Sequence, residues 1–315
     1  AGRAALNKLG PTPEVHAAKA PPVRDKAYLA AVEILYSGNG TKQQRDARYC
    51  DAMQRLAAAY PHDNNAQLFY ALALMGRNEG VRNIPDYLQA AAIAKRIFKL
   101  NPQNPGAAHY WIHGMDDPQH AAGALVAARA LSKIAPDAGH AQHMTSHIFM
   151  ALGMWDDVVT ANENATRVVY AHAKAEGKPQ VHCFHYNEWL EYGYFQQGRY
   201  RTAENLLQGC QCTGSEALRG MDTKQAAMFN DRFHWSLMRM RATAVVESHD
   251  WNGKAANMRI DTSTLGDDAG WNDFVIGYAA AERGDVALAK TSFAALDKLT
   301  TTMRLPNPDD PQLAG

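Results

Sequence analysis

Two stretches of the sequence share one pattern: residues 97–113, IFKLNPQNPGAAHYWIH, and residues 131–147, LSKIAPDAGHAQHMTSH. Each begins with apolar and basic residues, passes through a proline and ends in two histidines that are four positions apart. Pro102 and Pro136 lie 34 residues apart, and the same offset separates the two histidine pairs. An offset shared by a helix-breaking proline and by paired histidines is typical of an internal repeat.

The sequence around these stretches predicts helices. From residue 27 onward, Ala, Leu, Met and aromatic residues recur at spacings of three and four, whereas alternating Val, Ile and Thr are scarce. Short segments rich in Pro, Gly, Asn and Asp interrupt this pattern. Separately, the Gly-containing segments at 152–155, 197–200 and 283–285 resemble the turn between the two helices of a repeat. We therefore expect an all-α chain of roughly six to seven antiparallel helix pairs.

The repeat resembles the tetratricopeptide repeat (TPR) over roughly residues 27 to 300, as in Leu152-Gly153-Met154-Trp155. The resemblance implies a TPR-like α-solenoid, in which stacked helix pairs share a core and curve around a concave surface. We expect an N-terminal helix and Pro-rich connector at 1–24, a remnant of upstream repeats, then a superhelical domain at 25–304 and a flexible tail at 305–315. The longer spacing from Gly153 to Gly198 predicts an extended helix and loop near 165–181.

Composition narrows the class of partner. The 315 residues carry 32 Lys plus Arg and 32 Asp plus Glu, so no net charge attracts nucleic acid. No apolar run is long enough to span a membrane. The four cysteines do not fix the redox compartment. Cys210 and Cys212 are too close together for an ordinary loop-closing disulfide, and we expect them at the end of a helix.

The histidines form the candidate site. His109 and His113, like His143 and His147, are spaced to share one face of a helix. The TPR register implies that these four residues line the concave groove. It implies the same for five further residues in the repeats: His140, Asp116, Asp117, His185 and Glu188.

Imidazole nitrogens and carboxylate oxygens together suit Zn²⁺, Fe²⁺, Mn²⁺ or Cu²⁺. The predicted metal ligands are therefore His109, His113, His143, His147, Asp116, Asp117, His140, His185 and Glu188. Two alternatives stay open: the histidines contact a ligand in the groove without metal, or they serve in packing. The aromatic segment 184–195 is expected to lie mostly in the core, although it could also form a wall for a ligand.

A narrower resemblance covers about residues 100 to 165. The HxxxH helix at 109–113, the acidic pair at 116–117, the Ile-Ala-Pro at 134–136 and the segment 143–149 resemble a bacterial family of TPR proteins. Thr145 stands where we expect Pro in that family. The resemblance implies the fold and no particular activity. Because many members look exported, it also implies a periplasmic or secreted protein, while a cytoplasmic location stays open.

Two classes of function remain. One is a TPR-type binding protein whose concave groove holds a peptide, a protein or a small molecule, with a metal site in the groove. The other is a metal-dependent enzyme, a hydrolase or an oxidoreductase, in which the metal activates water or dioxygen. A metal-free scaffold is a third alternative. The sequence contains no Gly-rich phosphate loop, GxSxG turn or HExxH helix, so it assigns no catalytic residue.

Overall fold

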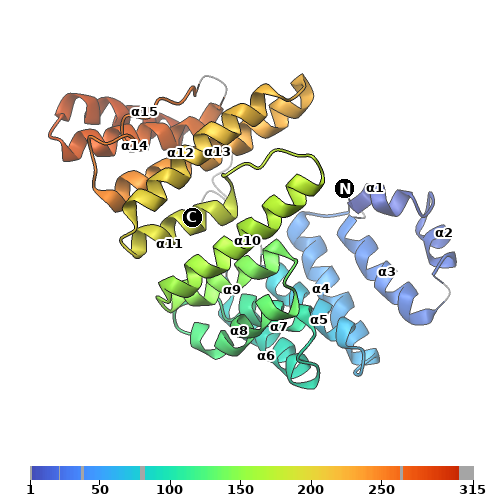
Figure 1. Cartoon of the computed structure of the whole chain (residues 1–315). Coiled ribbons are helices and arrows are strands. Elements are labelled where there is room, and N and C mark those ends of the chain that lie inside the picture. The colour runs from blue at the N-terminus through green and yellow to red at the C-terminus, as the bar shows by residue number, and fades with distance from the viewer. Residues whose placement is uncertain (1, 21, 37–38, 79–81, 263–264, 305–315) are drawn as a thin grey trace. The chain divides into compact units, whose positions relative to one another are not determined.

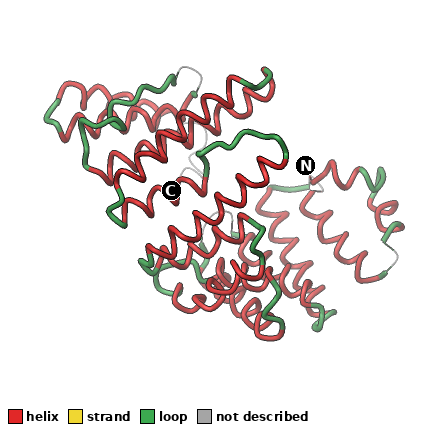
Figure 2. The backbone as a smooth tube through the Cα atoms, in the orientation of Figure 1, coloured by secondary structure: helices red, strands yellow, loops and turns green. Residues whose placement is uncertain are grey.

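A computed structural model describes residues 2–20, 22–36, 39–78, 82–262 and 265–304. Within these ranges the regular structure is helical and contains no strand (Figures 1 and 2). No helix in the same ranges combines the length and the apolarity that a membrane span needs. The predicted all-α class is confirmed. The tail predicted for 305–315 lies outside the described residues.

The chain divides into two compact units, residues 1–136 and residues 137–315. In the first unit, successive helices pack against one another. Its helices are α1 (Gly2–Asn7), α2 (Pro13–Ala18), α3 (Val23–Tyr36), α4 (Lys42–Ala59), α5 (Asn64–Gly76), α6 (Ile84–Leu100), α7 (Pro105–Gly114), the 3₁₀-helix η1 (Ala121–Ala124) and α8 (Leu125–Ile134).

The second unit is built in the same way, with each helix packed against the next one in sequence. Its helices are α9 (Gly139–Ala151), α10 (Trp155–Ala175), α11 (His185–Gln196), α12 (Tyr200–Arg219), α13 (Thr223–Ser248), the 3₁₀-helix η2 (Gly266–Ala269), α14 (Gly270–Glu282) and α15 (Val286–Arg304). The long α10 and the segment after it account for the extended spacing predicted near 165–181.

Each unit has an apolar core between its helices. In the first unit the core includes Met53, Leu56 and Leu74. In the second unit, Leu207 and Met240 belong to the core that joins α11, α12 and α13. Burial of such side chains contributes about 1.5–3 kcal/mol each, which makes helix–helix packing the main source of stability.

Three turns between paired helices have the same backbone design. In each turn a glycine adopts a positive φ: Gly153 (68°), Gly198 (71°) and Gly284 (78°). In each, the amide that follows the glycine donates to a carbonyl five residues earlier at 2.8 Å, as Arg199 does to Tyr194. This bond satisfies a carbonyl that the helix end leaves unpaired, and it needs the left-handed conformation that glycine adopts readily. The predicted turns at 152–155, 197–200 and 283–285 are confirmed.

The predicted helix ends are also confirmed at both prolines. Pro102 and Pro136 each stand two residues beyond the last residue of a helix, α6 and α8 respectively. After the first proline, Asn104 caps the next helix by accepting from the amide of Ala107, and Pro105 occupies the first turn of α7. The repeated sequence pattern therefore corresponds to a repeated helix–break–helix unit.

Two local predictions were wrong. The connector predicted before residue 24 contains a second helix, α2, because Thr12 caps it and Pro13 favours its first turn. Cys210 and Cys212 lie within α12 and not at its end. The residues around them, Gly209 and Gly214 included, are weak helix formers, and packing of α12 against its neighbours overrides that preference.

Candidate metal centre

Three histidines of the second unit lie close together. His143 and His147 come from α9 and His185 from the first position of α11. Each offers a ring nitrogen, and these nitrogens all lie within 4.8 Å of one another. His143 is fully buried, His147 is partly buried and His185 is exposed, so the group reaches from the interior to the surface. Within this unit, the structure thus brings three of the nine predicted ligands together in one group.

His143 is oriented by a buried hydrogen bond to α10. The side-chain amide of Asn162 donates to the carbonyl of Val158 at 2.9 Å, so its Oδ1 accepts from His143 Nδ1 at 2.7 Å. Because Nδ1 carries the proton, Nε2 carries the lone pair that a metal requires. Burial lowers the pKa of His143 to about 3, which keeps the imidazole neutral under ordinary conditions.

The spacing of the ring nitrogens fits a metal ion. His143 Nε2 and His147 Nε2 are 3.2 Å apart. Two nitrogen ligands of a tetrahedral Zn²⁺, each at about 2.0–2.1 Å, lie about 3.3 Å apart. The ring of His185 lies 4.5 Å from that of His143, measured between centroids. Partial burial and the neighbouring His147 and Arg239 lower the pKa of His185, so this imidazole is also kept neutral.

Aromatic rings line the histidine group. Tyr186 lies 4.8 Å from His143, and Trp189 lies 4.5 Å from His147, measured between ring centroids. Both come from α11, while Leu190, Tyr194 and Phe195 of the same helix point into the core. The predicted core role of the aromatic segment is therefore confirmed for part of it, while Tyr186 and Trp189 lie against the histidines. Apolar rings around the histidines limit the access of water and strengthen the interaction of nitrogen ligands with a cation.

Glu188, a predicted ligand, lies on α11 but has other partners. Its Oε1 accepts from the hydroxyl of Ser236 at 2.7 Å, and its Oε2 pairs with Arg239 at 3.3 Å. Burial raises the pKa of Glu188. Among the described residues it is not one of the donors that lie close to His143, His147 and His185. His140 is exposed at the start of α9, with its ring centroid 6.4 Å from that of His143.

The remaining predicted ligands lie in the first unit. The rings of His109 and His113 adjoin each other on α7 with centroids 4.7 Å apart, as their spacing predicts. Asp116 and Asp117 follow the end of α7, so they do not extend its face. Asp117 pairs with Arg82 at 3.0 Å and with His120 at 2.7 Å, and its role is to close the turn after α7.

Several residues that shape the group were not predicted. Asn162, Ser236 and Arg239 come from α10 and α13, and a disulfide joins Cys183 to Cys210 just before His185. Nothing in the local sequence identifies them, because they act from other helices. Asn162 and Ser236 are both polar residues buried within helices, and that burial is decided by packing that the local sequence does not show.

Comparison of the sequence with known proteins does not assign the chain to a family. No protein-family model matches the chain, and no curated protein matches its sequence. The resemblance to TPR proteins therefore stays a prediction.

Glu191 is a buried acid on α11 that lies near Glu188. Its side chain is fully buried, neither carboxyl oxygen has a hydrogen-bond partner, and burial, with the nearby Glu188, raises its pKa well above 4.5. The folded protein therefore holds the neutral acid. Its contribution to stability is complete below the unfolded-state pKa and is lost as the pH rises towards the folded-state pKa.

We predict that, at pH 8, Glu191→Gln raises the free energy of unfolding by about 1–3 kcal/mol and therefore unfolds at a higher urea concentration than the wild type. At pH 4 the two proteins should unfold at the same urea concentration. Far-UV circular dichroism measures both transitions. Exposed Glu216 on α12 supplies the control, because Glu216→Gln should behave as the wild type at both pH values. Equal stability of Glu191→Gln and wild type at pH 8 would contradict a neutral buried carboxyl.

Proposed function

We propose that this protein binds one transition-metal ion through His143, His147 and His185. The observation that carries the proposal is the buried His143, whose Nε2 faces His147 Nε2 at 3.2 Å while Asn162 holds its other nitrogen. Placing neutral imidazoles side by side in a partly dry site costs solvation, and coordination of a cation would offset that cost. Charged side chains in this region pair elsewhere, as Glu188 does with Arg239.

The donor set favours Zn²⁺ or Cu²⁺ among the four predicted metals. Imidazole nitrogen suits both ions, whereas Mn²⁺ prefers carboxylate and carbonyl oxygen. The group formed by His143, His147 and His185 contains no carboxylate within the described part of the chain. Between the two, we propose Zn²⁺ because three nitrogen ligands at tetrahedral spacing match its usual geometry.

The metal prediction is tested by elemental analysis. Tag-free protein purified without chelator or nickel resin is expected to hold about one equivalent of Zn²⁺ per chain or to take it up on titration. Because His147→Ala removes one ligand of three, it should weaken binding about 100-fold or more. Isothermal titration calorimetry at pH 7.5 measures the change.

Exposed His172 on α10 supplies the matched control. His172→Ala removes a histidine from the same unit and should bind Zn²⁺ as the wild type does. Wild-type protein that takes up no transition metal would refute the proposal. Equal affinity of His147→Ala and wild type would refute the assignment of its ligands.

A metal-dependent enzyme is the second candidate, and one observation favours it. Three protein ligands leave the fourth tetrahedral position for water or substrate, which is the arrangement of catalytic rather than structural zinc sites. The exposed His185 puts that position near the surface.

An open position can be detected without knowing the substrate. In protein loaded with Co²⁺, azide should shift the visible absorption bands in a saturable manner, because the anion enters the vacant coordination position. A spectrum that azide does not change would indicate a closed shell and would favour the binding protein over the enzyme.

We further propose that the helix pairs form a TPR-like solenoid whose groove accepts a peptide, a protein or a small molecule. Two observations support this. The three helix-pair turns share one hydrogen-bond design, and α7 and α9 begin 34 residues apart. A 34-residue helix pair is the unit of the TPR.

We also propose a periplasmic or secreted location. The support is the disulfide between Cys183 and Cys210, since such bonds persist in oxidising compartments and are rare in the cytosol. Cys50 and Cys212 are free thiols. When the native host's cells are lysed in denaturant with an alkylating agent, mass spectrometry is expected to find two of the four cysteines alkylated. Four alkylated cysteines would contradict an oxidising location.

A further inference from the structure

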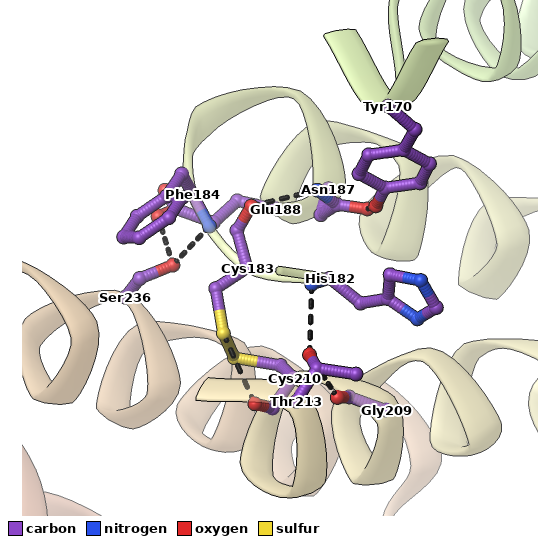
Figure 3. Close-up of a disulfide and its surroundings, with 10 residues drawn as sticks. All are labelled: Tyr170, His182, Cys183, Phe184, Asn187, Glu188, Gly209, Cys210, Thr213 and Ser236. Atoms are coloured by element: carbon purple, nitrogen blue, oxygen red, sulfur yellow. Dashed lines mark hydrogen bonds between the residues drawn. A yellow bond between two sulfur atoms is a disulfide. The ribbon is translucent and has the colours of Figure 1, made fainter. Parts of the chain in front are cut away.

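We propose that the Cys183–Cys210 disulfide positions His185, so that the affinity of the three-histidine site for metal depends on the oxidation of these cysteines. The inference rests on the proposed metal centre and adds its regulation. Cys183 and His185 are separated by a single residue, and Cys210 lies within α12. The bond therefore ties the entrance of α11 to α12 (Figure 3), and its Cys183 end lies two residues before a proposed ligand.

The residue between the disulfide and the ligand has a strained backbone. Phe184 has φ 76° and ψ 178°, a region that residues other than glycine rarely adopt. Such a conformation is unfavourable and persists only where the surroundings enforce it. The Phe184 ring packs edge-on against Phe229 with centroids 5.9 Å apart, and the Arg232 guanidinium lies 5.4 Å from its centre. This conformation sets the direction in which His185 leaves the backbone.

Hydrogen bonds from α13 and α11 support the same segment. The amide of Phe184 donates to Ser236 Oγ at 2.7 Å, and Ser236 in turn donates to Glu188. Asn187 donates to the carbonyl of Cys183 at 2.6 Å and accepts from the Tyr170 hydroxyl at 2.8 Å. Figure 3 shows how these contacts converge on the first turn of α11 from both sides. Ser236 is thus a second positioning residue.

A hydrogen bond, weaker than the covalent disulfide, also holds residues 182–184 on the side away from His185. The amide of His182 donates at 2.9 Å to Thr213 of α12. With the disulfide intact, residues 182–184 are fixed to α12 and α13 together. Without it, the strained Phe184 is held by hydrogen bonds and ring contacts alone, and relaxation of its backbone would turn His185 away from His143.

Reduction by a dithiol would supply this release. Cys183 and Cys210 gain two electrons and two protons and become thiols, while the dithiol is oxidised to its own disulfide. The metal then keeps His143 and His147, which share α9, but loses the ligand from α11. Disturbance of groups that orient a ligand typically costs 10–100-fold in metal affinity, and we expect a loss of that size.

The test uses Co²⁺, whose visible absorption reports the number and geometry of its ligands. A Cys50→Ala, Cys212→Ser background leaves the disulfide pair as the only cysteines. In this background three forms are compared: the oxidised protein, the reduced protein, and a variant that carries both Cys183→Ala and Cys210→Ala. The alanine variant is needed because the freed thiols could themselves bind metal. Competition with a chromophoric chelator gives each affinity, and circular dichroism checks the helix content.

We expect the oxidised background to bind as the wild type does, and the alanine variant to bind 10–100-fold more weakly with an altered Co²⁺ spectrum. Equal affinity and spectrum in a folded alanine variant would overturn the inference and leave the metal centre intact. Failure of every form to bind Co²⁺, wild type included, would overturn the proposed metal centre and this inference with it.

A second variant decides the matter if the alanine variant does not fold. Ser236→Ala keeps the disulfide but removes the partner of the Phe184 amide, and it should weaken Co²⁺ binding with unchanged helix content. Ser248→Ala, at the last residue of α13, is its control and should bind normally. Equal affinity of Ser236→Ala and wild type would count against positioning of His185 by this network. Ser236→Thr, which restores the hydroxyl, is expected to recover affinity.

Discussion

The hydrogen bond between Asn162 Oδ1 and His143 Nδ1 determines what the histidine group can do. It lies in the interior, so it is not exchanged for water, and it fixes which ring nitrogen carries the proton. Reversal of the tautomer would direct an N–H at His147 and leave no lone pair for a cation. Helix α10 supplies the acceptor of this bond, because Asn162 lies on the face of α10 that packs against α9.

Each side of the site is held by a different kind of force. His143 and His147 share one helix, so their separation follows from helix geometry and needs no further support. His185 belongs to another helix, and its place depends on how the chain enters α11. A disulfide, a strained residue and a hydroxyl network meet at that point. Specific covalent and polar contacts are therefore concentrated at the entrance of α11, where regular secondary structure alone cannot position His185.

The sequence predicts the parts of this site that are local and misses those that are not. The helix ends at Pro102 and Pro136 and the pairing of His143 with His147 follow from periodicity and from the geometry of proline. Glu188 was predicted as a ligand because the TPR register implied that its face of the helix lines the groove. That face adjoins α13, where Ser236 and Arg239 engage the carboxylate. Which residue of a distant helix meets a given side chain is decided by packing, and local patterns carry no record of it.

The separation of acids from histidines has a chemical consequence. Three neutral imidazoles would leave the full charge of the proposed divalent cation uncompensated, whereas a carboxylate ligand would cancel part of it. A more positive centre lowers the pKa of a bound water more strongly and attracts anions to its open position. Glu188, paired with Arg239, adds little negative charge beside the histidines. If the proposed ion is bound, this arrangement would favour an anionic ligand taken from solution, through the side where His185 is exposed.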